Sequence, residues 1–244
     1  MLAKLTWTEI KLGLREPTVA VFALAFPLIL LYLLLNSFGT LPDPDFGGVS
    51  PADYYVPAYA VGSIAATGLI AVPVHLAAYR ERGVLRRLRA LGVAAWPVLA
   101  AQTLVAALIV TAGTAVMVAL GNASYELSTP ASVAVVVAGL ALATATFSAV
   151  GVALASLLPT ARASQVVGLL AFFAMFFISG GGPPEAILPG EVAAVADALP
   201  MSYAVDVLQR GWWTGAWDVT GLAVQAAVLV AATALALWRL RDAD

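Results

Sequence analysis

The sequence contains no cysteine, one histidine and two lysines, and only 11% of its 244 residues are charged. The absence of cysteine excludes disulfides and thiolate metal sites, and a soluble domain is typically about one quarter charged. The dipeptide Gly-Lys does not occur, which excludes a phosphate-binding loop with its lysine. A water-soluble globule is therefore excluded, and so is a chain that hydrolyses ATP through its own phosphate loop.

Long apolar runs take up most of the chain, which is 62% hydrophobic. A helix needs about 20 apolar residues to cross a bilayer. Runs of this kind predict six spans, near 18–38, 57–78, 97–120, 132–157, 165–182 and 219–238. We therefore expect an all-α integral membrane protein with one transmembrane domain over residues 1–244. No small-residue cleavage site follows the first run cleanly, so we interpret it as a retained span.

The basic residues predict the orientation of these spans. If the connections alternate sides, eleven of the twelve Lys and Arg residues fall on one side, and Arg210 alone falls on the other. That other side carries nine acids, namely Asp43, Asp45, Asp53, Glu126, Glu185, Glu191, Asp197, Asp206 and Asp218. An excess of Lys and Arg marks the cytoplasmic side. Both termini are therefore predicted to be cytoplasmic.

The predicted spans contain no Asp, Glu, Lys or Arg. Proton-driven carriers usually need titratable groups at membrane depth, so a proton-coupled mechanism has no evident carrier here. Sodium coupling through neutral oxygen ligands stays open as an alternative. An intramembrane enzyme that uses Ser179 and His75 is disfavoured, because these residues are predicted at opposite ends of spans about 30 Å long.

The fifth predicted span contains a run of aromatic residues. At helical spacing, Phe172, Phe173, Phe176 and Phe177 share one face. Such a stripe more often packs on another helix or on lipid, and a route for an apolar solute is the functional alternative. In the fourth span, Gly139 and Gly151 lie in small-xxx-small patterns that allow helices to approach closely.

Two cytoplasmic segments are amphipathic. Residues 2–15 predict an interface helix with Trp7 on the apolar side and a basic strip of Lys4, Lys11 and Arg15 on the other. Such a helix lies in the membrane interface, with its cations toward anionic lipid.

The second cytoplasmic segment is "YRERGVLRRLRALGV", residues 79–93. After Gly83, a short helix places Val84, Leu85, Leu88 and Leu91 on one side and Arg86, Arg87 and Arg89 on the rest. A charge run that only determines orientation needs no apolar stripe. We therefore interpret this segment as a docking helix for a cytoplasmic protein, with Glu81 and Arg82 beside it, and a solvated or lipid-facing charge run is the alternative.

An outer segment of about three dozen residues separates the last two spans. Pro189, Gly190 and Pro200 divide it into two short helical runs, 191–199 and 201–210. These runs are apolar enough to enter the outer leaflet as re-entrant or interfacial helices. A small folded cap is the alternative.

Four stretches together resemble the membrane subunit, or permease, of type-2 ABC exporters. They are "LREPTVAVFALAFPLILLYLL", "RERGVLRRLRALGV", "SGGGPPEAILP" and "LPMSYAVDVLQRGWW". The resemblance covers the full chain. It implies a coupling helix at residues 81–91 and an outer motif that includes Pro200, Tyr203, Asp206 and Arg210. Val84 departs from the family pattern, in which many relatives have Thr after the glycine.

The resemblance also implies partners and a place in the cell. A second permease, identical or homologous, would pair with this chain, and two ABC ATP-binding subunits would carry ATP and Mg. On this chain we expect no metal, no cofactor and no nucleic acid. The expected location is a bacterial cell membrane, and the expected activity is efflux of a hydrophobic or amphipathic compound such as a drug, antibiotic, lipid or peptide, as in multidrug resistance.

Overall fold

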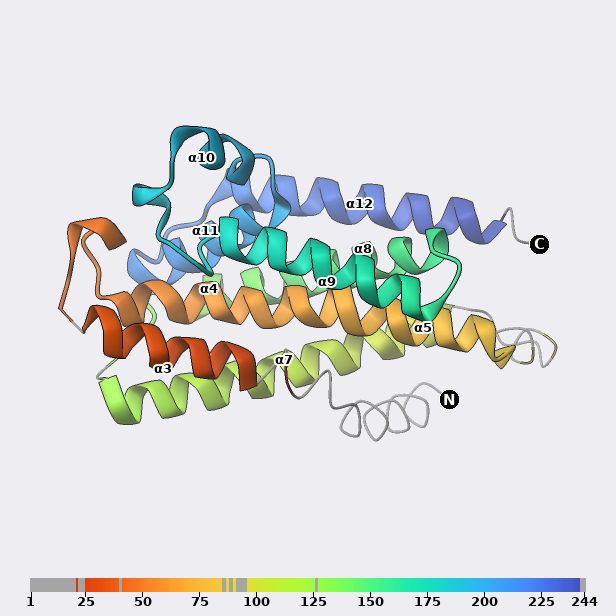
Figure 1. Ribbon diagram of the computed structural model, residues 1–244, viewed down its shortest axis with the longest axis horizontal. Coiled ribbons are helices and arrows are strands. Elements are labelled where there is room, and N and C mark those ends of the chain that lie inside the picture. Colours follow the sequence, from red (N-terminus) through yellow and green to blue (C-terminus); the bar gives the residue numbers. More distant parts are fainter. Residues whose placement is uncertain are drawn as a thin grey trace.

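The computed structural model describes residues 21, 25–39, 41–84, 87, 90, 96–125 and 127–241. These residues form helices and no strand (Figure 1), so the predicted all-α fold is confirmed for this part of the chain. Five of its helices are long and apolar enough to cross a membrane. The long helices are α4 with α5 (Pro51–Ala66 and Val72–Glu81), α7 (Trp96–Tyr125), α8 (Val133–Leu157), α9 (Ala161–Ile178) and α12 (Val219–Arg241). The first predicted span, 18–38, contains α3 (Phe26–Phe38).

Helix α4 forms the centre of the bundle. Every residue of α4 except Asp53 is buried, and its neighbours are α3, α7, α8, α9 and α11. In Figure 1, α4 and α5 form one continuous rod, with α3 and α7 on one side and α8, α9 and α12 on the other. The central position explains why α4 is rich in Ala, Tyr and Val but has no polar face.

Between α4 and α5 the rod widens into one π-helical segment, η3 (Thr67–Ala71). Pro73 follows it and has no N–H to donate to the Leu69 carbonyl. Two glycines of neighbouring helices lie directly against this segment. A Cβ added to Gly151 of α8 would lie 2.0 Å from the Gly68 carbonyl oxygen, and a Cβ added to Gly168 of α9 would lie 2.0 Å from the Leu69 carbonyl oxygen. The backbones of α8 and α9 therefore pack directly on the backbone of η3, an approach that Cα–H···O contacts need.

Several helices begin earlier than the apolar runs predicted. Ser50 accepts a hydrogen bond from the Asp53 N–H and so begins α4 at Pro51, six residues before the predicted span 57–78, which continues through η3 into α5. Thr160 accepts a hydrogen bond from the Ala163 N–H and begins α9 at Ala161, four residues before the predicted span 165–182. A prediction from hydropathy leaves out the polar first turn of a helix. The capping hydroxyls of Ser50 and Thr160 show where that first turn begins.

The outer segment contains η4 (Glu185–Ile187), α10 (Gly190–Ala196) and α11 (Pro200–Trp213). The runs predicted at 191–199 and 201–210 correspond to α10 and α11. Helix α11 is more than an interfacial element, because most of its residues are buried and it packs against α4, α8 and α12. A short 3₁₀ turn, η2 (Pro44–Phe46), lies near η4 on the same end of the bundle.

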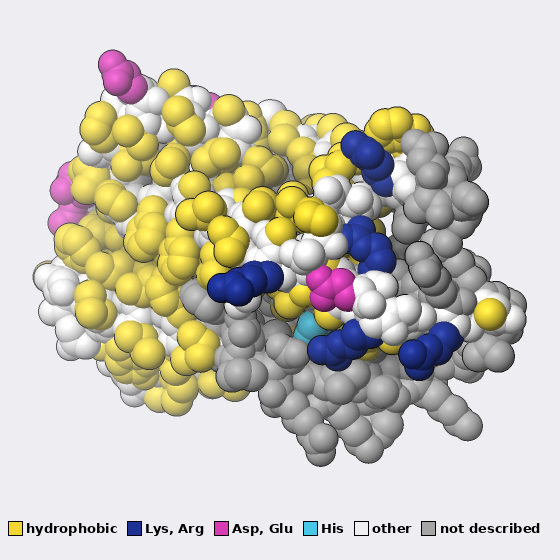
Figure 2. Space-filling model, turned by 45° about the vertical axis from the view of Figure 1, so that its right-hand side comes forward, with side chains coloured by type: hydrophobic (Ala, Val, Ile, Leu, Met, Phe, Trp, Pro, Cys, Tyr) yellow, Lys and Arg dark blue, Asp and Glu magenta, His cyan; other side chains and the backbone are white. Residues whose placement is uncertain are grey.

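The charged residues divide between the two ends of the bundle. One end, here the basic end, carries Arg80, Arg82, Arg87, Arg162 and Arg239. The opposite end, here the acidic end, carries Asp43, Asp45, Asp53, Glu191, Asp197, Asp206 and Asp218. Figure 2 shows Arg side chains gathered at the former and a broad apolar surface along the bundle. This surface suits contact with lipid tails.

Candidate functional site

At the basic end, Arg80 joins the end of α5 to the end of α8. Its Nη1 donates to the Ala155 carbonyl oxygen at 2.9 Å, and its Nη2 donates to the Leu158 carbonyl oxygen. The last carbonyl groups of a helix have no donor within the helix and carry partial negative charge. The guanidinium therefore supplies both the donors and the charge that the end of α8 needs.

The next residue, Glu81, makes the reciprocal contact with α9. Its Oε1 accepts a hydrogen bond from the Ala161 N–H at 2.9 Å. The first N–H groups of a helix lack partners and carry partial positive charge, which a carboxylate satisfies. Arg80 and Glu81 thus connect α5 to both helices of the α8–α9 turn, an arrangement called the α5 junction below. Glu81, predicted to face a partner protein, has a partner in its own chain.

The predicted coupling segment begins directly after this junction. Gly83 ends α5 with φ +68°, a left-handed conformation that glycine adopts without steric cost. Helical geometry resumes at Val84, and the Arg87 N–H donates to the Gly83 carbonyl oxygen at 3.1 Å. Arg82 and Arg87 are exposed, and Val84 is half-buried. Other predicted coupling or interface residues lie outside the described residues, namely Lys4, Trp7, Lys11, Arg15, Leu85, Arg86, Leu88 and Leu91.

The phenylalanine stripe of α9 divides between two environments. Phe172 and Phe176 are fully buried, and both rings contact Phe26 of α3. Phe176 also stacks on Tyr59 of α4 at 5.6 Å between ring centroids. Phe177 is 46% exposed. Half of the stripe therefore builds the core, and only the Phe173–Phe177 side is accessible for an apolar solute or a neighbouring molecule.

At the acidic end, the four residues of the predicted outer motif all lie on α11. Pro200 begins this helix, and its carbonyl oxygen accepts a hydrogen bond from Gln225 Nε2 of α12. The Tyr203 hydroxyl donates to the Asp197 carbonyl oxygen at 2.7 Å. These contacts attach the start of α11 to the last span and to the segment after α10.

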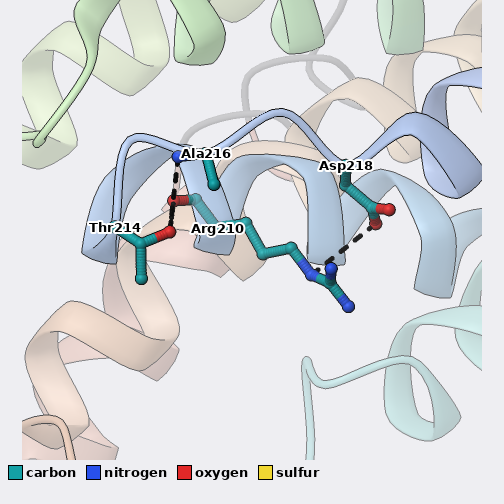
Figure 3. A network of polar contacts seen from close by, with 4 residues as sticks. All are labelled: Arg210, Thr214, Ala216 and Asp218. Atoms are coloured by element: carbon teal, nitrogen blue, oxygen red, sulfur yellow. Dashed lines mark hydrogen bonds and ion pairs between the residues drawn. The ribbon is translucent and has the colours of Figure 1, made fainter.

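The remaining two motif residues lie toward the end of α11. Arg210 Nε is 3.8 Å from Asp218 Oδ2, and Asp218 is almost fully buried. Figure 3 shows this pair across the turn between α11 and α12, where Thr214 Oγ1 accepts a hydrogen bond from the Ala216 N–H at 3.3 Å. Asp206 lines a cavity of about 520 Å³ between η2, η4, α10 and α11, together with Arg210.

A hydrogen-bond network joins the start of α4 to α11 and to the α7–α8 connection. Asp53 Oδ1 accepts from the N–H and the hydroxyl of Ser128, at 3.0 and 2.6 Å. Trp212 Nε1 donates to Ser128 Oγ at 3.2 Å, and Trp213 Nε1 donates to the Asp53 carbonyl oxygen at 3.0 Å. This carbonyl needs an outside donor, because the residue four positions on is Pro57, which has no N–H.

The sequence of this helix bundle matches a known protein family. The profile of the family described as ABC-2 type transporter matches residues 2–212, most of the chain. The chain belongs to the ABC-2 type transporter family. No curated protein matches the sequence in a direct comparison.

Membership of this family means that the chain is the permease subunit of an ABC transporter. It is therefore a multi-pass membrane protein whose domain serves transport. An ABC-2 permease works with an ABC ATP-binding partner. The match includes the predicted interface helix, the segment 81–91 and the outer motif, which ends at Arg210. It stops just before Trp213, so the last span lies beyond it.

Sequence reasoning missed two features of this ABC-2 permease. The first is the network around Asp53, although Ser50 and Asp53 have the spacing of a capping box and Pro57 predicts a carbonyl without its usual donor. The second is Gly168, whose close contact with η3 has no signal in the sequence beyond the residue type. In both cases the partner lies far away along the chain.

Proposed function

We propose that this chain is the permease subunit of an ATP-driven exporter and that residues 82–91 dock on the ATP-binding subunit. Two permeases, identical or homologous, would pair, with one ATP-binding subunit and its ATP and Mg under each. The cargo would be a hydrophobic or amphipathic compound such as a drug, antibiotic, lipid or peptide. The basic end would face the cytoplasm of a bacterial cell.

The α5 junction carries this proposal. A docking segment can move membrane helices only if its attachment to them is stiff. Here the segment follows Arg80 and Glu81 directly, and these two residues hydrogen-bond to α8 and α9. A displacement of residues 82–91 would therefore move three helices together. Since a few kcal/mol of differential contact shifts a two-state equilibrium, binding of ATP by the partner would suffice to switch the permease.

Changes that place negative charge on the apolar docking face test the docking step. In proteoliposomes that contain the permease and its ATP-binding partner, we expect Leu85→Asp with Leu88→Asp to reduce transport at least about tenfold while ATP hydrolysis continues, because loss of about 1.4 kcal/mol of coupling free energy corresponds to tenfold. The matched control is Leu41→Asp, a Leu-to-Asp change at the acidic end where the side chain is 80% exposed. It should transport normally.

Changes at the junction test transmission separately from docking. Arg80→Ala with Glu81→Ala should leave binding of the ATP-binding subunit intact, because the docking residues are unchanged, and should still reduce transport. Co-purification measures binding, and substrate accumulation in the same vesicles measures transport. Normal transport by the Leu85 and Leu88 double variant would contradict the docking assignment. Transport driven by an ion gradient without ATP would instead favour a secondary carrier.

A further inference from the structure

The cavity at the acidic end has the size and the lining of a ligand site. Its volume of about 520 Å³ lies within the range of small-molecule sites in proteins. The lining combines aromatic rings, carboxylates and one amide, contributed by η2, α4 and α11. None of these residues takes part in the docking and transmission proposed above.

The aromatic wall of the cavity is held in place before any ligand binds. Trp213 stacks on Tyr54 at 6.1 Å between ring centroids, and Phe46 packs edge-on against Tyr54 at 5.5 Å. The indole N–H of Trp213 is tied to the Asp53 carbonyl oxygen. Phe46 and Tyr54 are almost fully buried, whereas Trp213 is only half-buried. Trp213 is therefore the ring that a ligand would meet, and a ring with fixed geometry binds at low entropic cost.

The charge around the cavity favours a cation. Asp45 and Asp206 line it, and the one lining guanidinium, Arg210, is paired with the buried carboxylate of Asp218. Arg210 is also the only basic residue of the sequence between residues 163 and 238. The lining thus contains two carboxylates and one guanidinium, in a concave site that concentrates the negative field.

Gln209 supplies a polar group without a full set of partners. The side chain is 94% buried and lines the cavity, and its Nε2 donates to the Tyr54 carbonyl oxygen at 3.2 Å. Among the described residues, no donor reaches its Oε1. This amide oxygen can accept a hydrogen bond from a ligand that carries an N–H or an acidic C–H group. A metal ion is disfavoured, since no group of three or more potential ligands occurs in the described part of the chain.

We propose that this cavity binds a monovalent organic cation, an ammonium compound whose apolar body lies against Trp213 and whose charge faces Asp45 and Asp206. Cation–π attraction to the indole and charge attraction to the carboxylates act together on such a ligand. This proposal concerns binding alone. It does not depend on whether the cation is the transported compound or on whether residues 82–91 dock on the ATP-binding subunit.

Calorimetric titration of the purified permease in lipid nanodiscs tests the proposal. The probes are benzyltrimethylammonium, the anion benzenesulfonate and the neutral benzyl alcohol. We expect saturable binding of the cation alone. Asp45→Asn and Asp206→Asn should each weaken it about threefold to tenfold, the range that a partly exposed ion pair supplies. Trp213→Ala should weaken it further.

A matched control separates local from general charge effects. Glu191→Gln removes an exposed carboxylate of α10 at the same end that does not line the cavity, and should leave affinity within about twofold, because charges in solvent are screened. Three results would overturn the proposal: no saturable binding of the cation up to millimolar concentration, equal binding of the anion, or affinity unchanged in both aspartate variants. Displacement of the cation by micromolar Ca²⁺ would also overturn it, because the site would then be a metal site.

Discussion

The contact of α8 and α9 with the π segment predicts a graded response to adding one methyl group. Gly151 and Gly168 meet carbonyl oxygens of η3, and an added Cβ would lie 2.0 Å from each. Gly139, also on α8, would instead place its Cβ 2.8 Å from side-chain atoms of Val207 and Leu208. Gly190, at the start of α10, has nothing within 4 Å of the added atom.

The magnitude follows from what can yield. Overpacking of a core costs typically 1–3 kcal/mol, when side chains can adjust. At Gly151 and Gly168 the obstacle is backbone inside a helix, and it must retreat by about 1 Å or more to restore an ordinary contact. We expect Gly151→Ala and Gly168→Ala each to lower the free energy of unfolding by about 3 kcal/mol or more. Gly139→Ala should cost about 1–2 kcal/mol, and Gly190→Ala should be near neutral.

Reversible unfolding in mixed micelles, followed by tryptophan fluorescence and helical circular dichroism, measures this series. Equal denaturant slopes across the variants would establish that stabilities are compared between the same states. The reasoning fails if Gly168→Ala is as stable as Gly190→Ala, because the close backbone packing of α9 on η3 would then be absent. A cost at Gly139 larger than at Gly151 would contradict the distinction between backbone and side-chain obstacles.

Two further predictions concern the left-handed residue Gly83 and the hydrogen bond to the Asp53 carbonyl oxygen. Gly83 has open space around its Cα but a φ of +68°, so Gly83→Val should cost about 1–2 kcal/mol of stability through strain alone, whereas Gly190→Val serves as the unstrained control in the same unfolding assay. Trp213→Phe should cost about 1–3 kcal/mol by leaving the Asp53 carbonyl without its donor. In a Pro57→Ala background the main-chain N–H can replace that donor, so the cost of Trp213→Phe should fall by about 1 kcal/mol; strictly additive costs would refute the compensation.

Local patterns were sufficient for part of the site. Gly83 was expected to interrupt the helix after "YRER", and the structure ends α5 there, because a left-handed residue after a helix is a local preference. The two outer helices were expected on either side of Pro200, because proline has no N–H to continue one helix and suits the first turn of the next. The docking face of residues 84–91 rests on the sequence pattern, since five of these eight residues lie outside the described part of the chain.

Contacts between distant segments were beyond sequence reasoning. Glu81 was interpreted as an acidic contact for a partner protein, but its carboxylate meets the start of α9, 80 residues along the chain. The phenylalanines of α9 share one helical face in the sequence, yet their surroundings differ, because α3 and α4 cover Phe172 and Phe176 and leave Phe177 accessible. Periodicity predicts which residues share a face, but the neighbouring helices decide what that face touches.

The sequence by itself determined that this chain is an apolar helical membrane protein with positive charge concentrated in a few segments and no phosphate loop of its own. These properties depend on composition and on the spacing of residues within one helix, so they can be inferred from the sequence without knowledge of contacts between helices. Only the tertiary structure decided that Arg80 and Glu81 tie α5 to two other helices, that Trp213 replaces the donor missing at Pro57, and that an acidic, aromatic cavity forms beside α11. The first two depend on backbone groups left without partners in one helix and on side chains brought to them from another. The cavity depends on side chains that several distant elements bring together, and hydropathy carries no information about either pairing.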